Sequence, residues 1–219
     1  FSPPRPASAR SLGLVGSEMC IRDSHIIKVP ASSTNLGAGF DSLGLALSLY
    51  LEIQIEESAT KGIEINVTGE GSNDLKDVRK NLIWKVLQKV FIGEKKTVPN
   101  IKLSVFNQIP LARGLGSSAA AIVGGLGIFE AITGLELTQE KFFRYALALE
   151  DHPDNLCAAR FGGFTVSCTS DVGRVSFIQL KIGKPIKILL VVPDLSLIHI
   201  SEPTRPRLSS YAGVWGKKK

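Results

Sequence analysis

The sequence predicts an α+β fold in which helices cover an antiparallel or mixed sheet. Three segments, residues 49–56, 63–67 and 101–105, alternate apolar and polar residues as strands with one wet face do. Residues 81–92 carry apolar side chains at helical spacing. Residues 117–133 are apolar or small nearly all round, which is typical of a buried helix.

The first half of the chain is expected to form strands. Residues 26–29 resemble a short strand that Pro30 ends, and a loop of small residues follows from Ala31 to Gly39. The alternation that begins at Ser48 predicts a strand, and residues 63–67 would return beside it as a hairpin.

The second half is expected to be mostly helical. Within the buried helix Gly124, Gly125 and Gly127 each cost about 1 kcal/mol relative to Ala, which indicates close approach to neighbouring backbone. Thr138 can cap a further helix that extends to about Glu150. The remaining expected elements are a short helix at 155–160 and strands at 164–169, 174–180 and 187–192.

Both ends of the sequence differ in character from the rest. Residues 1–24 and 198–219 are rich in Pro and basic residues and lack any usable period, so we interpret them as non-native or flexible flanks. Residues 25–170 are expected to form one domain, and residues 171–197 the start of a second domain that breaks off.

Composition excludes several classes of protein. The net charge of +6 belongs mostly to the C-terminal flank, and residues 25–197 carry only +1, which argues against a nucleic-acid partner. No apolar run approaches the roughly 18 residues of a membrane span. Three cysteines without ligand-like spacing predict free thiols in a cytoplasmic protein rather than disulfides or a zinc site.

The segment with most chemical information joins a strand to the buried helix. Glycines allow close approach there, and the N–H groups and dipole of the helix N-terminus favour a phosphate. A glycine-rich turn with Ser as the helix cap is the local alternative. The segment runs through Pro110, Leu111, Ala112, Arg113, Gly114, Leu115, Gly116, Ser117, Ser118, Ala119 and Ala120.

This segment resembles the nucleotide loop of the GHMP kinases, the family of galactose, homoserine, mevalonate and phosphomevalonate kinases. The resemblance implies that residues 110–120 bind ATP. It also implies a fold with a ribosomal-S5-like first domain and a ferredoxin-like second domain.

Two further segments are similar to the homoserine kinases. Residues 32–41 (SSTNLGAGFD) match their N-terminal motif, and His152-Pro153-Asp154-Asn155 matches their His-Pro-Asp-Asn signature. Asp151 departs from the Gly that is common there, which puts the local turn in question. The resemblance implies transfer of the ATP γ-phosphate to the side-chain hydroxyl of L-homoserine, a step of threonine biosynthesis.

The resemblance assigns the substrate to four residues. Asn35, Asp41, His152 and Asn155 would contact homoserine, with Asp41 and Asn155 nearest the chemistry. Their chemistry agrees, because a carboxylate suits the ammonium group and amides can hold a hydroxyl without adding charge. Turn chemistry for Asn35 and Asp41, and a helix cap for His152, are the local alternatives.

The expected metal is Mg²⁺, which prefers a carboxylate together with phosphate oxygens and water. We expect Glu150 and Ser117 to hold it, with Ser118 as the alternative hydroxyl, and Glu150 to count among the catalytic residues. A solvated Glu150 is the alternative interpretation.

Arginine for the substrate α-carboxylate is missing from these motifs, since Arg113 belongs to the phosphate loop. Homoserine kinases supply it from the second domain, so we expect the 219-residue chain to be nearly inactive. Homodimers are common in that family, which makes a dimer an expectation by analogy. The rival interpretations are another GHMP kinase, acting on mevalonate or a sugar, and a ligand-binding relative without transfer activity.

Overall fold

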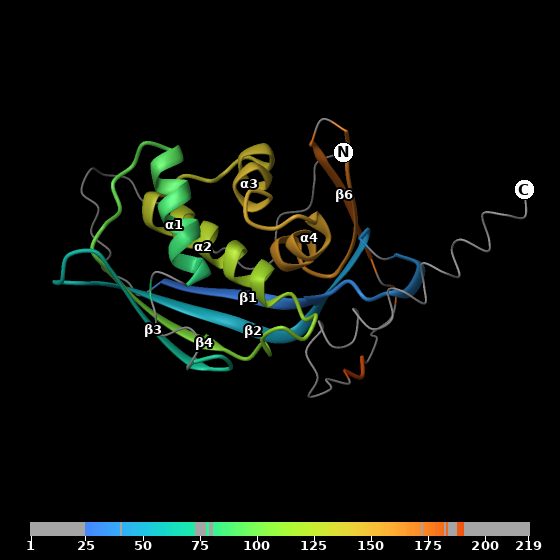
Figure 1. Ribbon diagram of the computed structural model, residues 1–219, viewed down its shortest axis with the longest axis horizontal. Coiled ribbons are helices and arrows are strands. Elements are labelled where there is room, and N and C mark those ends of the chain that lie inside the picture. The colour runs from blue at the N-terminus through green and yellow to red at the C-terminus, as the bar shows by residue number, and fades with distance from the viewer. Residues whose placement is uncertain are drawn as a thin grey trace, which may run out of the picture.

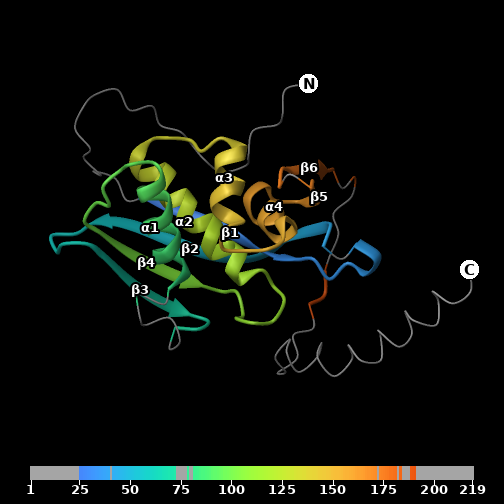
Figure 2. The same cartoon turned by 45° about the horizontal axis from the view of Figure 1, so that its top comes forward.

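The computed structural model describes residues 25–39, 41–72, 78, 81–171, 173–181, 183 and 188–190. In these residues the helices lie together on one face of a six-stranded sheet, as Figure 1 and Figure 2 show. The prediction of an α+β fold with helices over a mixed sheet is therefore confirmed. No helix in the described part of the chain is long and apolar enough to cross a membrane.

The sheet is built around one long strand, β2. Its strands follow the order β3-β4-β2-β5-β6, and β1 pairs with β2 beside this path. The pair β3 and β4 is parallel, and the other pairs are antiparallel. The strands are β1 (His25–Ser33), β2 (Leu43–Glu57), β3 (Ile63–Gly69), β4 (Ile101–Asn107), β5 (Phe164–Thr169) and β6 (Val175–Leu180).

The alternation in β2 has the predicted orientation. Leu51, Ile53 and Ile55 are buried beneath the helices, whereas Glu52 and Gln54 are only half-buried. Because successive side chains of a strand point to opposite faces, this register places the apolar set in the core.

The hairpin predicted for β2 and β3 is wrong. β4 lies between them, so that β3 pairs in parallel with β4 from Ile63 beside Ile101 to Gly69 beside Asn107. Parallel neighbours need a crossover connection, and α1 (Leu82–Gly93) provides it. The alternating pattern of residues 63–67 indicates a strand but carries no information about its partner.

The prediction that Pro30 ends the first strand is also wrong. β1 continues to Ser33, with a register shift between Pro30 and Ala31. β1 pairs only with β2 among the described residues, and a proline is tolerated in a strand with an open edge or at a bulge. The continuation places Ser32 and Ser33 in the strand instead of a loop, and Ser32 contacts Asn155 and Leu115.

The helices α1 and α2 form the main layer above the sheet. α1 begins after Asn81, whose side-chain oxygen accepts a hydrogen bond from the Ile83 amide (2.9 Å). α2 (Ser117–Thr133) has the predicted bounds. A Cβ on Gly124 would lie 2.8 Å from the Ile53 side chain of β2, and one on Gly125 would lie 2.7 Å from the Val86 side chain of α1. The glycines therefore permit close approach, but chiefly of side chains rather than of the backbone that was predicted.

Two shorter helices complete the layer. α3 (Gln139–Ala146) begins after Thr138, which caps the Lys141 amide (3.3 Å), but it ends four residues before the predicted limit at Glu150. α4 (Pro153–Phe161) includes the predicted helix at 155–160. Of the strand expected at 187–192, residues 188–190 are described and do not form a strand, and the other positions lie outside the described residues.

Candidate active site

The connection from β4 to α2 has an unusual backbone. Ala112, Gly114 and Gly116 have positive φ values of 55°, 71° and 65°. The residues between them, at positions 113 and 115, do not have positive φ. Alternation of right- and left-handed conformations turns successive N–H groups toward one side and makes a concave anion-binding nest. The backbone of the predicted phosphate loop is therefore suited to bind phosphate oxygens.

The N-terminus of α2 is open at the same place. Gly116 occupies the cap position, and no side chain accepts a hydrogen bond from the first amides of the helix. These amides and the helix dipole present partial positive charge to any group outside the helix end. A nest that leads into an uncapped helix N-terminus favours an anionic ligand.

The loop is held by residues outside the glycine motif. The Ser32 amide donates to the Leu115 carbonyl (3.1 Å). The Asn107 side chain accepts from the Ile109 amide (3.0 Å) and donates to the Glu70 carbonyl (3.0 Å), which fixes the end of β4. Sequence analysis missed Asn107, although a lone Asn at a strand end is a recognisable turn signal.

Glu150 lies against the start of α2. Its carboxylate accepts a hydrogen bond of 2.5 Å from the Ser118 hydroxyl. Glu150 stands in the turn after α3, where its amide donates to the Ala146 carbonyl (3.1 Å). No corresponding bond links Ser117 to Glu150 among the described residues, so the metal role predicted for Ser117 stays a prediction.

The donor set at this point fits a magnesium ion. A carboxylate oxygen and a hydroxyl oxygen lie together beside a phosphate-binding backbone, and Mg²⁺ takes few protein ligands and completes its shell with phosphate oxygens and water. The described residues contain no cluster of three or more His, Cys, Asp or Glu that could hold a metal by itself. A metal here would depend on the nucleotide for its remaining ligands.

The other half of the site is the N-terminus of α4. The Asn155 side-chain oxygen accepts a hydrogen bond from the Ser32 hydroxyl (2.8 Å), and its nitrogen donates to the Thr34 hydroxyl (3.4 Å). A Cβ on Gly116 would lie 2.0 Å from the Ser32 Oγ and 3.0 Å from the Asn155 Oδ1. The homoserine-kinase motif residue Asn155 is thus in contact with the phosphate loop.

Asp154 is a buried carboxyl that sequence analysis quoted within the motif but assigned no role. Its side chain is 2% exposed and accepts a hydrogen bond from the Asn155 amide (2.6 Å). Burial raises the pKa of Asp154, and the nearby Asp41 carboxylate raises it further, whereas the Asn155 amide, His152 and the Thr34 hydroxyl oppose the rise. Asp151 and His152, just before it in the sequence, are exposed, so the local sequence gave no signal that this one carboxyl would be buried.

The other predicted substrate residues lie around this buried group. His152 is the cap residue of α4, with its side chain exposed and no capping hydrogen bond. Asp41 is exposed and adopts a left-handed backbone conformation (φ 62°), which is uncommon for a residue with a Cβ. Asn35 is exposed in the loop after β1. The structure therefore places Asp41 and His152 near Asp154, and Asn35 one residue beyond Thr34.

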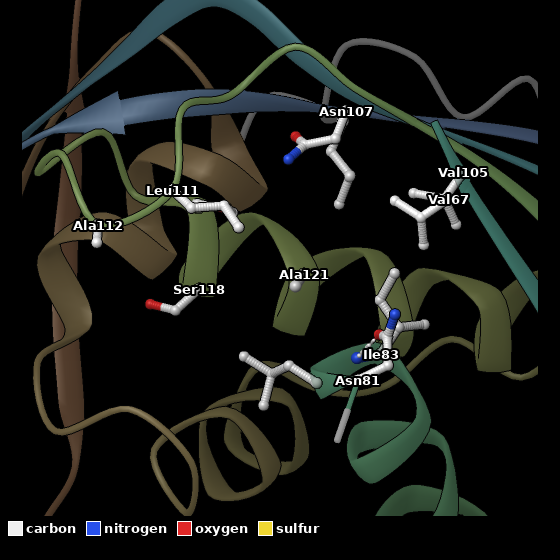
Figure 3. Close-up of a pocket in the computed structure, with 12 residues that line it drawn as sticks. Val67, Asn81, Ile83, Val105, Asn107, Leu111, Ala112, Ser118 and Ala121 are labelled. Carbon is white, nitrogen blue, oxygen red and sulfur yellow. Dashed lines mark hydrogen bonds between the residues drawn. The ribbon is translucent and has the colours of Figure 1, made fainter. Parts of the chain in front are cut away.

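A cavity of about 230 Å³ opens beside the phosphate loop (Figure 3). In Figure 3, Ala121 and Ser118 of α2 line one side, Asn81 and Ile83 of α1 another, and Val67 and Val105 of the strands a third. Its walls are mostly apolar, with two carboxamides among them. A flat apolar group with a few polar atoms would fit such a cavity, next to the site of its phosphates.

Comparison with known proteins agrees with this geometry. Residues 81–163, from the cap of α1 to the end of α4, match the family model of the GHMP kinases N terminal domain. The fold resembles solved GHMP kinases as well, including the Methanococcus jannaschii mevalonate kinase (TM-score 0.56, 15% identity, 74% of this chain and 57% of that one). Residues 81–163 are therefore similar to the N-terminal domain of the GHMP kinases, and the described fold is of the same kind.

Over most of its length the chain is similar to homoserine kinases. It is 41% identical over 171 residues to the homoserine kinase of Carboxydothermus hydrogenoformans and 41% identical over 169 residues to that of Campylobacter hominis. These alignments cover 78% and 77% of this chain but 55% and 57% of the relatives. The crystal structure of the Cytophaga hutchinsonii homoserine kinase superposes with a TM-score of 0.63 at 25% identity, over 78% of this chain and 54% of that one. The chain spans little more than half the length of these relatives.

Proposed function

We propose that the protein is a homoserine kinase, which transfers the γ-phosphate of ATP to the side-chain hydroxyl of L-homoserine. One observation carries the proposal. The Ser32 hydroxyl donates a hydrogen bond to Asn155 of the homoserine-kinase motif and also lies against Gly116 of the phosphate loop. An acceptor hydroxyl held by Asn155 would therefore lie next to phosphates held by the loop, as direct phosphoryl transfer requires.

ATP would lie along the start of α2. The nest at 112–116 and the first amides of α2 would bind the phosphates, and the apolar cavity beside Ser118 would receive the base. Burial of a purine between apolar walls supplies affinity, and the carboxamide of Asn81 can contribute a directional hydrogen bond. Residues 110–120 remain the proposed nucleotide site.

Ser118 and Glu150 would hold Mg²⁺, which when bound supplies neutralisation of the negative charge on the phosphates. Ser117, the hydroxyl favoured by sequence analysis, is the alternative ligand. The hydrogen bond between Ser118 and Glu150 orients both oxygens toward each other before a metal arrives. The carboxylate of Glu150 would thus be held at the open end of α2.

The acceptor would bind between Asp41, His152 and Asn155, with Asn35 at the edge. Asp41 offers a carboxylate for the substrate ammonium, and Asn155 offers an amide for the hydroxyl. Phosphoryl transfer depends more on alignment and charge neutralisation than on a strong base. Asp154 is buried and bound to the Asn155 amide, so it orients Asn155 and is poorly placed to take a proton.

The proposal is tested by ADP release from MgATP with L-homoserine, mevalonate and galactose as acceptors. We would assay both the 219-residue chain and the longest reading frame that contains it. ADP release that depends on L-homoserine alone would support the proposal. Release with mevalonate or galactose instead would keep the nucleotide site and overturn the acceptor.

The shorter chain has its own expected result. We expect it to bind MgATP but to turn over slowly, because the three motifs supply no Arg for the substrate α-carboxylate. Normal turnover by the 219 residues alone would show that the arginine is not needed. A folded chain that binds no nucleotide would contradict the proposed function as a whole.

A further inference from the structure

Glu150 lies outside any helix or strand. α3 ends at Ala146, and Glu150 follows in a turn that the structure fixes by amide bonds to the Ala146 carbonyl from Leu149 (3.0 Å) and Glu150 (3.1 Å). The position of Glu150 at Ser118 is therefore set by the position of α3. α3 has only eight residues, too few for a helix to be stable alone, so its place depends on its packing contacts.

One polar residue of α1 anchors α3. Glu94, the C-cap residue of α1, is 14% exposed and accepts hydrogen bonds from the Lys141 ammonium (2.7 Å) and the Tyr145 hydroxyl (2.8 Å). Arg144 adds a third positive group, 3.7 Å from the same carboxylate. All three partners lie on α3, so a single carboxylate joins one helix end to one face of the other.

The local sequence is adapted to this contact. A Cβ on Gly93 would lie 2.3 Å from the Tyr145 hydroxyl, so the tyrosine can reach Glu94 only because residue 93 lacks a side chain. The hydrogen bond from Lys141 lowers the pKa of Glu94, and the bond from Tyr145 lowers it further. The anchor is thus charged at neutral pH.

A second contact extends the attachment toward the site. Lys89, earlier on α1, donates to the Ala148 carbonyl (3.5 Å) in the turn after α3. Residues of α1 therefore bond both Lys141 in α3 and Ala148 in the turn that follows. Glu150, two residues later, bonds Ser118 of α2. At its other end α1 lines the cavity through Asn81 and Ile83. α1 connects the cavity, the anchor and the turn within one rigid element.

We propose that Glu94 is a positioning residue that, through Lys141 and Tyr145 of α3, holds the turn carrying Glu150 against Ser118. It touches neither nucleotide nor acceptor and acts only through α3. The proposal rests on the function proposed above for Glu150, but it assigns a role to a residue outside all three sequence motifs.

The test uses Glu94→Ala, Glu94→Gln and Tyr145→Phe, with Glu140→Ala as the matched control. Glu140 is an exposed glutamate in the first turn of the same helix α3. ATP affinity is measured by calorimetry with Mg²⁺ and with EDTA. We expect Glu94→Ala to weaken MgATP binding about tenfold and to leave binding of metal-free ATP within about twofold, since loss of a supporting contact typically costs 10–100-fold in metal affinity.

The conservative variants refine this result. Glu94→Gln keeps an oxygen for Tyr145 and should recover part of the MgATP affinity. Tyr145→Phe removes a single hydroxyl and should fold even if Glu94→Ala does not, with a smaller loss of the same kind. Glu140→Ala should bind like the unaltered chain.

Amide hydrogen exchange of residues 147–151 provides a readout that is independent of nucleotide. We expect faster exchange in this turn for Glu94→Ala and unchanged exchange for Glu140→Ala. Unchanged exchange at 147–151 in Glu94→Ala would overturn the proposal, as would equal losses of affinity with and without Mg²⁺. If the unaltered chain bound no ATP, the proposed function would fail while the exchange experiment still decided the role of Glu94.

Discussion

Arg160 of α4 and Glu130 of α2 form a two-point ion pair, with N···O distances of 2.8 and 2.9 Å. Their side chains are 23% and 14% exposed, and Glu130 also accepts from the Leu137 amide (3.0 Å). The pair lies toward the C-terminal ends of two helices whose N-termini meet at Gly116 and Asn155. It therefore fixes the far ends of the two helices that carry the site.

Loss of this pair should destabilise the protein. Arg160→Met removes the guanidinium, which also lies over the Phe142 ring, and leaves the Glu130 charge without its partner. We expect the free energy of unfolding, measured with urea, to fall by about 2 kcal/mol. Arg174→Met, at an exposed arginine, should change it by less than about 0.5 kcal/mol. Equal effects of the two variants would show that the pair contributes no special stability.

Gly116 and Gly134 allow backbone strain to be separated from steric contact. Both have a left-handed backbone, with φ values of 65° and 66°, at the two ends of α2. A Cβ on Gly134 meets nothing within 4 Å, whereas one on Gly116 lies 2.0 Å from Ser32. We expect Gly134→Ala to cost about 1–2 kcal/mol of stability and to leave ATP affinity unchanged.

Gly116→Ala should lose more stability than Gly134→Ala, because its methyl group also displaces Ser32. It should lose about tenfold or more in ATP affinity as well, because the nest is disturbed. Urea unfolding and calorimetry measure the two quantities. ATP binding that survives Gly116→Ala would exclude the 112–116 backbone as the phosphate site.

The two serines at the start of α2 should differ in their effect on metal dependence. Ser118 is bonded to Glu150, and Ser117 is not. In the longest reading frame that contains this chain, and given the proposed activity, we expect Ser118→Ala to lower kcat about 100-fold and to raise the Mg²⁺ concentration needed for half-maximal rate. Ser117→Ala should have a smaller effect on both. The reverse order would restore the assignment made from sequence, in which Ser117 is the ligand.

Asp154 should reduce stability at neutral pH. Burial raises the pKa of Asp154 above its ordinary value of 3.8, so folding favours the protonated acid and the charged form is penalised. Asp154→Asn removes the charge and keeps an oxygen for the Asn155 amide. We expect its free energy of unfolding to exceed that of the unaltered chain at pH 7.

The advantage of Asp154→Asn should shrink as the pH falls through the folded-state pKa toward 3.8, because the carboxyl is then protonated in both states. Asp151→Asn, at an exposed carboxyl three residues earlier, should show no such dependence. Urea unfolding of both variants between about pH 3.5 and 7.5 would span the titration of the Asp154 carboxyl. A gain that did not change with pH would argue against burial of a charge as its cause.

Much of the fold follows from patterns that are local in the chain. Helix 117–133 has the predicted bounds because its small residues and the glycines that flank it, Gly116 and Gly134, are neighbours in the sequence. The phosphate loop was recognisable for the same reason, since a nest needs glycines at neighbouring positions and no distant partner. Composition and alternation likewise predicted strands with one wet face.

Other features depend on contacts between residues far apart in the sequence. The local pattern predicts a strand at 63–67 but not its partner. The strand pairs in parallel with β4 because α1 crosses between the two strands. Pro30 interrupts a pattern, and only the edge position of β1 lets the strand continue past it. No local pattern distinguishes these outcomes from the predicted ones.

Some features of the candidate site could likewise be predicted from local sequence, and others depend on the tertiary structure. The sequence by itself predicted residues 110–120 as the phosphate site and named Asn155 and Glu150 as site residues. Only the tertiary structure decided that Ser118 is the hydroxyl at Glu150, that Asp154 is the buried carboxyl of its motif, and that Glu94 anchors α3. The physical reason is that burial and hydrogen-bond partners arise from the packing of whole helices, which no short stretch of sequence encodes.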